Sequence, residues 1–420
     1  MRIALLTYRG NMYCGGQGVY ASYLAREWRD QGHEVHVFAG PPLPELEPGI
    51  PLHEIPNDNV FGQKHPDFFD RERPFSLLKP LSLWELGVSR LGVFPEMQTF
   101  GIRLLRRWKQ YQQRYRFDVV FDNQSLSWGL LGIRATGVPV ISVIHHPLHI
   151  DREADFAIDP TFRMRLKRTL YFPLFMQQRV APRLDRIVTV SEASRHEIER
   201  YFGIPEKNVP VVYNGTDADL FRPVAGVRKD ADLLFVGRTD DRKKGIGTLL
   251  EALALLPKHI TLKIVDGRIT PSGLAARQIR RLGLADRILI ENRRMLTVPE
   301  LVEQYSTARV AIVPSFFEGF GFPASEAMAC GLPVIANAAG ALSEVVGTDG
   351  EAGYLVPPRD PSAVADAVRA VLAEPGRAER MGRAARARIQ KSFRWSDAAA
   401  QLAEIFEETR RAAHRRSRAA

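Results

Sequence analysis

The sequence predicts an α/β protein built from two doubly wound parallel sheets. Short apolar runs rich in β-branched residues alternate with helix-length amphipathic segments along almost the whole chain. Strands of this kind occur in parallel sheets whose two faces are covered by helices. The chain has 420 residues, which is enough for two large domains. The polar segment 215–231, which contains Gly and Pro, interrupts the alternation near its middle and is typical of a linker.

The first expected domain covers residues 1–214. Each expected strand is a short, mainly apolar run, and each expected helix has apolar residues three and four positions apart. The strands are 2–7, 34–39, 117–121, 138–144, 186–190 and 209–212, and the helices are 16–30, 98–114, 161–180 and 192–202. Segment 40–91 follows neither pattern because it is crowded with prolines. We expect it to be a loop excursion that shapes an acceptor site; a loop packed on its own domain is the alternative.

The second expected domain covers residues 215–393 and repeats the alternation. Its strands are 232–236, 261–265, 287–290, 309–313 and 333–336. Segment 394–416 is expected to form one helix, because Trp395, Leu402 and Phe406 recur on one face, and this apolar face needs a domain to pack against. Ligands of doubly wound sheets bind beyond the carboxyl ends of the strands, so candidate functional residues are expected there.

Charge and cysteine content narrow the function classes. The 58 Lys and Arg outnumber the 48 Asp and Glu, giving a net charge of +10. This favours anionic partners such as phosphorylated small molecules or an anionic membrane surface. The sequence has neither a zinc-finger spacing nor an alternation of basic and aromatic residues, so it gives no indication of nucleic-acid binding. The two cysteines are too far apart in the sequence for a disulfide framework or a metal-binding motif. No apolar run has the length and pattern of a signal peptide or a membrane-spanning helix. We therefore expect a cytoplasmic protein that can also make peripheral contact with the inner face of the membrane.

The densest motif is PSFFEGFGFPASEAMACGLPVI, residues 314–335, which follows an expected strand. Glu318 precedes a tight glycine loop, and Pro323 suits the first turn of a helix. Such a helix N-terminus is a ready anion site. Glu318 on the loop and Glu326, expected on the first helical turn, can accept hydrogen bonds from sugar and ribose hydroxyls. A solvated loop acid and an acid that stabilises the helix dipole are the respective alternatives.

A basic motif, FVGRTDDRKKGIG, follows the strand 232–236. Arg238 lies at the carboxyl tip of the strand, and Lys243 and Lys244 directly precede a helix. The guanidinium fork and the ammonium point charge together suit a diphosphate. A basic surface turn is the alternative.

The first domain offers two weaker signals. Gly16 belongs to a glycine-rich loop, residues 14–18, between the first strand and its helix, where backbone N–H groups can face a phosphate; a plain tight turn explains it equally well. His145 and His146 end a buried strand. A neutral imidazole there can bond a sugar hydroxyl or accept a proton, and a structural role is the alternative.

Taken together, these segments resemble the GT-B glycosyltransferases, specifically glycosyltransferase family 4. The resemblance runs from Gly15-Gly16 through His145, the tetrapeptide Asn214–Asp217 and VGR…KKG to EGFGFPASEAMACGLPVI and Gly340…Glu344. It implies two Rossmann-like domains facing across a cleft. The C-terminal domain would hold a nucleotide-sugar donor, the N-terminal domain the acceptor, and helix 394–416 would cross back to the first domain. It also implies retaining, metal-independent transfer.

The resemblance also implies roles, position by position. Arg238 and Lys244 would hold the donor diphosphate, Glu318 the donor sugar hydroxyls and Glu326 the ribose. Gly16 would let its loop close over the phosphates, and His145 would face the transferred sugar. The expected catalytic residues are Glu318, His145, Arg238 and Lys244. The expected donor-binding residues are Gly16, Arg238, Lys243, Lys244, Arg294, Glu318, Gly319, Phe320, Gly321, Phe322 and Glu326, with His145 and His146 on the acceptor side.

Three departures from the family pattern stand out. The VGR-to-KKG spacing is one residue longer than usual, so Lys243 could take the place of Lys244. Gly340-Ala341 stands where a double glycine is usual, and two histidines stand where one is typical.

The sequence thus predicts a retaining glycosyltransferase that moves a sugar from a nucleoside-diphosphate sugar to a hydroxyl acceptor, which is a glycan, a lipid-linked molecule or a small molecule. We expect a front-face mechanism and no cofactor or metal, because Arg238 and Lys244 can neutralise the leaving diphosphate. The alternatives are a sugar-nucleotide 2-epimerase or a phosphorylase on the same scaffold, or an inactive basic binding module.

Overall fold

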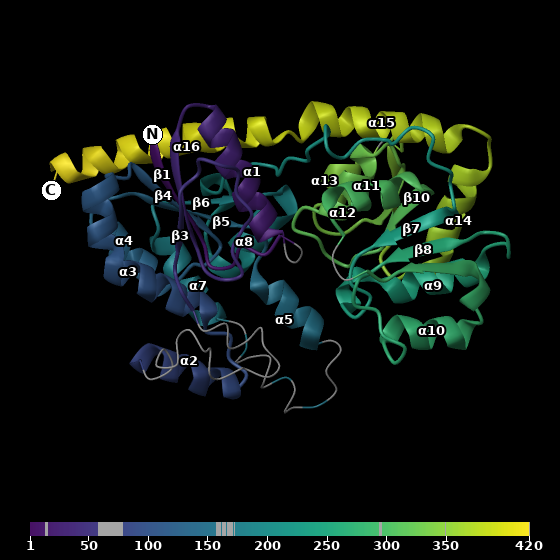
Figure 1. The fold of residues 1–420 in the computed structure, drawn as a ribbon, viewed down its shortest axis with the longest axis horizontal. Helices are drawn as coiled ribbons and strands as arrows, with labels where there is room; N and C mark the ends of the chain where they lie inside the picture. The colour runs from purple at the N-terminus through teal and green to yellow at the C-terminus, as the bar shows by residue number, and fades with distance from the viewer. Residues whose placement is uncertain are drawn as a thin grey trace. The chain divides into compact units, whose positions relative to one another are not determined.

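Figure 1 shows the computed structural model as a ribbon. It describes residues 1–12, 16–57, 79–156, 161, 165, 171, 173–293, 296–348 and 350–419. The chain divides into two compact units. Unit 1 consists of Met1–Val190, Ser194–Val212 and Ser396–Ala420, and unit 2 consists of Ser191–Ala193 and Tyr213–Trp395.

Unit 1 contains a six-stranded parallel sheet in the order β3-β2-β1-β4-β5-β6. The first strand lies near the middle and the chain winds outward in both directions, as in doubly wound folds. The strands are β1 (Arg2–Thr7), β2 (Glu34–Ala39), β3 (Leu52–Glu54), β4 (Val119–Asn123), β5 (Val140–Ile144) and β6 (Arg186–Thr189). Apart from α16, the described α-helices that lie wholly or mainly in unit 1 are α1 (Gln17–Asp30), α2 (Pro80–Arg90), α3 (Glu96–Tyr115), α4 (Trp128–Arg134), α5 (Leu148–Phe156), α7 (Leu174–Val180) and α8 (Glu192–Phe202).

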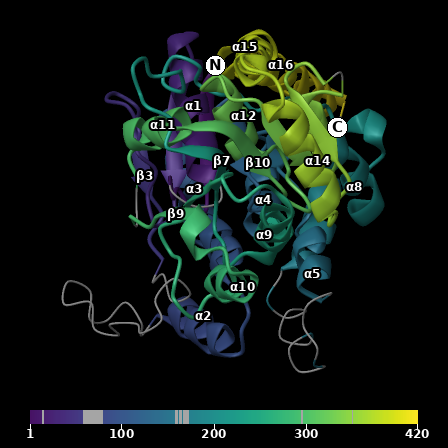
Figure 2. The ribbon, with the colours of Figure 1, turned by 90° about the vertical axis from the view of Figure 1, so that its right-hand side faces the viewer.

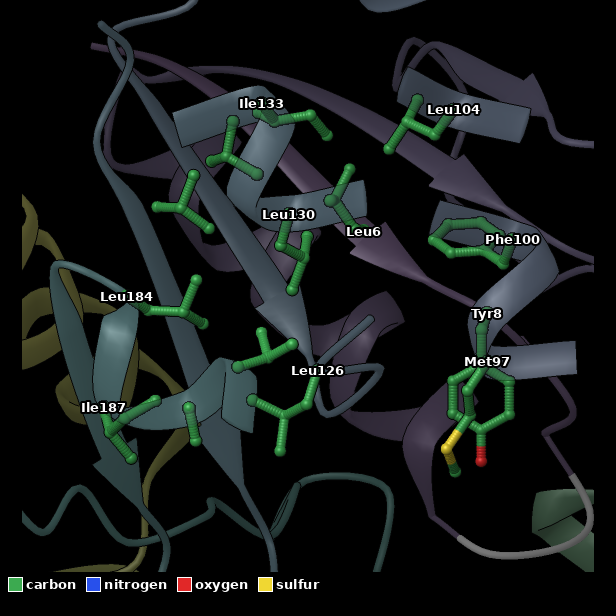
Figure 3. Packing of buried hydrophobic residues seen from close by; sticks show 14 of the residues in the cluster. Leu6, Tyr8, Met97, Phe100, Leu104, Leu126, Leu130, Ile133, Leu184 and Ile187 are labelled. Atoms are coloured by element: carbon green, nitrogen blue, oxygen red, sulfur yellow. The ribbon is translucent and has the colours of Figure 1, made fainter. Parts of the chain in front are cut away.

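The core of unit 1 forms where apolar strand residues meet the apolar faces of the helices. Figure 3 shows Leu6 of β1 among Phe100 and Leu104 of α3 and Leu130 and Ile133 of α4. All five residues are at most 1% exposed. This packing fixes β1 and β4 side by side, so their carboxyl ends open on one edge of the sheet.

The last helix, α16 (Trp395–Ala419), lies largely in unit 1. The Trp28 indole Nε1 of α1 donates to the Ala399 carbonyl oxygen at 2.9 Å. The Trp28 ring centroid lies 5.3 Å from that of Phe406, which lies 5.1 Å from that of Phe121 in β4. The apolar face read from the sequence therefore packs on α1 and β4.

Unit 2 contains a second six-stranded parallel sheet, in the order β12-β11-β10-β7-β8-β9. The strands are β7 (Ala231–Val236), β8 (Leu262–Val265), β9 (Ile288–Glu291), β10 (Ala308–Val313), β11 (Val334–Asn337) and β12 (Gly353–Val356). The helices are α9 (Ile246–Leu255), α10 (Leu274–Leu282), α11 (Val298–Ser306), α12 (Phe322–Ala329), α13 (Leu342–Val346), α14 (Pro361–Leu372) and α15 (Arg377–Ser392). Helix α9 packs against α10 and α14, and α12 packs against α13 and α15. Figure 2 shows the ribbon turned by 90°, with α9, α10, α12, α14 and α15 labelled.

The two parallel sheets confirm the predicted α/β class.

Some local expectations differ from the structure. Segment 40–91 is more than a loop: its described residues include the edge strand β3 and the helix α2, while residues 58–78 lie outside the described part. Segment 209–212 contributes only an isolated bridge, Thr189 to Val211. The expected helix 161–180 is tested only in part: residues 162–164, 166–170 and 172 lie outside the described part, and the described remainder includes α7.

The predicted linker is also partly packed. Its first residue, Gly215, lies so close to Trp395 that a Cβ atom there would stand 2.2 Å from the Trp395 backbone nitrogen. The Thr216 hydroxyl donates to the Ser325 hydroxyl at 2.8 Å, and Phe221 is buried. Residues 215–221 are therefore part of unit 2. Among the described residues, every helix is too short or too polar to span a bilayer.

Candidate functional site

Two loops meet at the carboxyl edge of the sheet in unit 2. One follows β7 and ends at Gly245, and the other follows β10 and leads into α12. The Phe316 N–H donates to the Lys243 carbonyl oxygen at 2.8 Å. A Cβ atom at Gly245 would lie 1.9 Å from the Pro314 carbonyl oxygen, so only glycine permits this approach. The basic motif and the Glu318 motif thus form one continuous surface, as their placement at strand ends predicted.

An ion pair joins the two loops. The Lys244 Nζ donates to Glu318 Oε1 at 2.6 Å, and the Ser315 hydroxyl donates to the same oxygen at 2.7 Å. The Glu318 side chain is 13% exposed and that of Lys244 26%. The structure therefore brings together two of the predicted catalytic residues, and it assigns the contact to Lys244. For Lys243 it shows backbone contacts: its N–H donates to Asp241 Oδ1 and its carbonyl accepts from Phe316.

The backbone of Glu318 is held from the β11 side. The Ala341 N–H donates to the Glu318 carbonyl oxygen at 3.0 Å. A Cβ atom at Gly340, where φ is 55°, would lie 2.4 Å from that oxygen and 2.9 Å from the Glu318 nitrogen. Glycine at 340 is thus required, whereas the alanine that departs from the family's double glycine is accommodated at 341.

Helix α12 starts directly after the glycine loop. Gly321 is its N-cap residue with φ 99°, a left-handed conformation that glycine adopts without strain, and Pro323 occupies the first turn as predicted. Phe320 is buried, and the Phe322 ring stacks on Trp395 with centroids 6.2 Å apart. These contacts fix the start of the helix beside Gly319 and Glu318. The eight-residue α12 directs its N-terminal N–H groups toward this end, which favours an anion there.

Glu326 differs from its predicted place. The first turn of α12 contains no acidic residue, and Glu326 lies one turn further into the helix, because the helix begins at Phe322. Its Oε2 accepts a hydrogen bond from the Tyr305 hydroxyl at 2.8 Å. Burial raises the pKa of Glu326 to about 7, against the opposing effect of the Tyr305 hydrogen bond. Near neutral pH this carboxyl group therefore changes between a donor and an acceptor.

Arg238 lies beyond the end of β7, as predicted. Its Nη2 lies 2.9 Å from Asp241 Oδ2, and its side chain is 44% exposed. The following residue anchors the loop: the Thr239 N–H and hydroxyl both donate to Asp266 Oδ2 at 2.7 Å. Asp266 is 5% exposed and follows β8. Predicted donor residue Arg294, with Met295, lies outside the described residues.

His145 lies at the carboxyl end of β5 in unit 1. Its Nε2 lies 2.7 Å from Asn123 Oδ1, at the end of β4. Burial, with a smaller effect from His146, lowers the pKa of His145 to about 3, so the imidazole is neutral at physiological pH. A neutral ring can act as hydrogen-bond donor and acceptor at once, which suits the predicted contact with sugar hydroxyls.

The other two predicted residues of unit 1 also lie at this edge. His146 Nε2 is 3.0 Å from Asp151 Oδ2 of α5. Gly16 is the N-cap residue of α1 with φ 73°, a conformation that favours glycine. Residues 13–15 lie outside the described part of the chain.

Sequence reasoning missed four residues that position this machinery: Asn123, Asp266, Tyr305 and Ser315. A signal existed for two of them. Asn123 ends a buried strand and Asp266 directly follows one, and the same criterion of a polar residue at a strand end identified His145. Tyr305 and Ser315 carried no comparable signal, because their roles depend on partners in other elements.

Two Asp-x-Asp triplets, 217–219 and 230–232, could suggest a metal site. The Asp217 carboxylate instead accepts from the N–H groups of Asp219 and Leu220. Asp230 pairs with Lys263, and Asp232 with Arg309. Within the described ranges, no three His, Cys, Asp or Glu residues are arranged to hold a metal ion.

Comparison with known proteins identifies relatives that align over more than nine tenths of the chain. The family model described as Glycosyltransferase Family 4 matches residues 14–220, and the one described as Glycosyl transferases group 1 matches residues 230–374. The MMP alpha-(1->4)-mannosyltransferase of Mycolicibacterium hassiacum is 38% identical over 97% of this chain and 98% of its own. The D-inositol 3-phosphate glycosyltransferase of Kribbella flavida is 29% identical over 91% of this chain and 88% of its own.

Solved structures share the fold. The sucrose-phosphate synthase of Thermosynechococcus elongatus superposes with a TM-score of 0.73 at 24% identity, covering 97% of this chain and 98% of its own. Anabaena HepE in complex with UDP and glucose gives a TM-score of 0.68 at 20% identity, over 97% and 99% of the two chains. The predicted GT-B fold and the predicted glycosyltransferase class are therefore confirmed.

Proposed function

The chain belongs to glycosyltransferase family 4, and from that premise we propose that it transfers a hexose, mannose first among candidates, from a nucleoside-diphosphate sugar to a hydroxyl of a saccharide. The observation that carries this proposal is the Lys244–Glu318 pair at the joined strand-end loops of unit 2. A cation for the diphosphate and a carboxylate for sugar hydroxyls stand within 3 Å of each other there, at the N-terminal side of α12.

Mannose is favoured by the relatives. The chain is 38% identical to a mannosyltransferase over nearly its full length, whereas its identity to the inositol-phosphate enzymes is 29% or lower. Because that mannosyltransferase forms an α-(1→4) bond according to its name, we propose a saccharide hydroxyl as the acceptor. A phosphorylated cyclitol is the second candidate.

The proposed chemistry is a front-face displacement with retention. The bond between the anomeric carbon and the diphosphate oxygen breaks, the acceptor oxygen bonds to the same face of that carbon, and the departing phosphate oxygen takes the acceptor proton. Lys244, Arg238 and the N-terminus of α12 would stabilise the charge that develops on the diphosphate. We propose that these groups supply the positive charge for which other transferases use a divalent cation.

The test is nucleoside-diphosphate release from GDP-mannose, UDP-glucose and ADP-glucose, each with and without α-mannosides or inositol 3-phosphate, and with and without a chelator. We expect release from one donor that increases with a mannoside, persists with chelator and disappears in Glu318→Ala. Lys258→Ala, an exposed lysine in the same unit, is the matched control and should keep wild-type rates. Retention is read from the anomeric configuration of the product by NMR.

The alternatives give different results. A 2-epimerase would convert its donor without an acceptor, and a phosphorylase would require inorganic phosphate. A binding module would release nothing from any donor and would bind random duplex with an affinity that falls steeply with salt. Any of these outcomes would refute transfer to a hydroxyl acceptor.

A peripheral membrane contact is proposed separately. Helix α2 and the residue after it expose Leu83 (49%), Trp84 (40%) and Leu91 (69%) beside the exposed cations Lys79 and Arg90. Apolar side chains flanked by cations suit an anionic bilayer surface. Co-sedimentation with vesicles containing acidic lipid, compared with neutral vesicles, should show binding that Trp84→Ser weakens; equal partition would refute the contact.

A further inference from the structure

Asn123 is a buried amide at the point where three segments of unit 1 meet. It ends β4 and has no exposed surface. Its Nδ2 donates to the Gln17 carbonyl oxygen of α1 at 2.9 Å and to the Thr7 hydroxyl of β1 at 3.3 Å. Its Oδ1 lies 2.7 Å from His145 Nε2, beyond β5. One side chain thus touches the ends of two neighbouring strands and the start of α1.

The partners determine which way the amide points. The Gln17 carbonyl oxygen can only accept a hydrogen bond. The Thr7 hydroxyl uses its own hydrogen to bond the Arg9 carbonyl oxygen at 2.8 Å, so toward Asn123 it too can only accept. Both therefore require the amide NH₂, and the amide oxygen is left facing His145.

The orientation of Asn123 in turn determines the tautomer of His145. Because Oδ1 has no hydrogen to donate, His145 Nε2 must carry the proton. Since the ring is neutral, its Nδ1 then holds a lone pair and acts as an acceptor. The Tyr20 ring packs edge-on against the imidazole with centroids 4.7 Å apart, which holds the ring plane.

The next residue secures the loop. Gln124 accepts from the His145 N–H at 2.7 Å and donates to the His146 carbonyl oxygen at 2.7 Å. Gln124 and Leu126 adopt φ values of 57° and 46°, which are unfavourable for residues other than glycine. Strain of this kind persists where the surroundings hold the backbone in place, and it concentrates at functional sites.

We propose that Asn123 is a positioning residue for the transfer reaction: it holds His145 with Nε2 protonated and Nδ1 presented as the acceptor for a hydroxyl of the transferred sugar, and it ties this imidazole to the start of α1, where Gly16 lies. The catalytic part rests on the proposed function, which places His145 beside the sugar. The tautomer itself does not depend on it.

The first test is long-range ¹H–¹⁵N NMR of ¹⁵N-histidine-labelled protein without donor, at pH 8, with the His145 signals assigned from their loss in His145→Gln. We expect wild type to show a protonated Nε2 and an unprotonated Nδ1. The nearly isosteric Asn123→Leu should lose this single-tautomer pattern. A protonated Nδ1 in wild type, or an unchanged pattern in Asn123→Leu, would overturn the proposal.

A second variant covers misfolding and separates the two roles of Asn123. The carboxylate introduced by Asn123→Asp still accepts a hydrogen bond from His145 Nε2, so the wild-type tautomer should return. It cannot donate a hydrogen bond to the Gln17 carbonyl oxygen. Thr189→Val is the matched control: it removes a buried hydrogen bond to the Ile144 carbonyl oxygen, 2.7 Å long, on the same strand end without touching the imidazole. It should keep the wild-type tautomer and kcat.

Kinetics on the donor that the panel identifies supply the readout of catalysis. Asn123→Leu should lower kcat about 10²-fold, with KM for the donor changing less than about threefold, because a misoriented imidazole weakens an interaction made in the transition state. A loss confined to KM would refute the positioning role, even if the NMR result holds. If no donor is turned over, the proposed function fails while the tautomer result stands independently.

Discussion

Lys244 and Glu318 lie 74 residues apart in the chain, yet Lys244 Nζ is 2.6 Å from Glu318 Oε1. Each comes from a loop at the end of a different strand, so the pair exists only because β7 and β10 are neighbours in the sheet. Without a donor the two charges satisfy each other. A bound diphosphate sugar would offer phosphate oxygens to Lys244 and hydroxyl groups to Glu318. Each side chain could then replace its contact with the other by a contact with the substrate.

Lys244→Ala is expected to lower turnover about 10²–10³-fold, because it removes positive charge where the leaving diphosphate develops negative charge. Lys243→Ala should cost far less, because it is the Lys244 Nζ that lies against the Glu318 carboxylate at the strand-end loops. Initial rates of nucleoside-diphosphate release from purified variants measure both. A larger loss in Lys243→Ala would reverse the assignment, as the longer VGR-to-KKG spacing suggested.

The strands of the sheet core could be predicted well because a strand that is buried on both faces consists almost entirely of apolar residues. β1 and β2 occupy the predicted residues, and in each the last five of six positions are buried. The edge strand β3 has three residues, none of them buried, and within the described part of the chain it pairs only with β2. Its existence depends on a neighbour, which no local pattern reveals.

The candidate site likewise contains residues that could be located from the sequence and contacts that could not. Residues at strand ends, such as His145 and Arg238, could be located because chain direction alone brings strand ends to one edge. The pairs Asn123–His145 and Tyr305–Glu326 join different elements over 22 and 21 residues, and they depend on strand order and helix packing. Glu326 was placed one turn early because α12 begins at Phe322, directly after the left-handed Gly321, so that Glu326 falls beyond the first turn.

Asp266→Ala is expected to weaken nucleoside-diphosphate binding about tenfold, which corresponds to about 1.4 kcal/mol. The Asp266 carboxylate accepts both hydrogen bonds from Thr239 and one from the Arg268 N–H at 2.9 Å, so its loss frees the loop that carries Arg238. Isothermal titration with the nucleoside diphosphate of the identified donor measures this. Unchanged affinity in a folded variant would show that Arg238 needs no such anchor.

Glu326 should make stability depend on pH. Burial raises its folded pKa to about 7 from 4.5, so between these values the folded chain binds more protons than the unfolded chain, and stability falls as pH rises. Subtracting the unfolding free energy of Glu326→Gln from that of wild type cancels the contributions of other titrating groups. These include Glu96, whose pKa burial also raises to about 7. The difference should decrease by on the order of 3 kcal/mol from pH 4.5 to 7 and then level off. A flat difference would contradict the raised pKa.

Nucleotide affinity should show the opposite trend through the same titration. In its predicted role the ionised Glu326 carboxylate would accept hydrogen bonds from ribose hydroxyls, so affinity should rise with a midpoint near pH 7 in wild type and not in Glu326→Gln. Tyr305→Phe removes a hydrogen bond that favours the ionised form and should move the midpoint upward. Titrations of the nucleoside diphosphate between pH 6 and 9 measure both, and a downward shift would contradict this role of Tyr305.

Gly340→Ala should abolish most activity by displacing Glu318 rather than by straining its own backbone. The new Cβ would lie 2.4 Å from the Glu318 carbonyl oxygen, and backbone on both sides leaves no flexible side chain to yield. Gly283→Ala is the matched control, because Gly283 also has a positive φ, 65°, but nothing lies within 4 Å of its missing Cβ. The control should cost about 1 kcal/mol of stability from left-handed strain alone and keep wild-type kcat. Equal losses of activity in the two variants would mean that strain, not the close approach to Glu318, accounts for the requirement for glycine at 340.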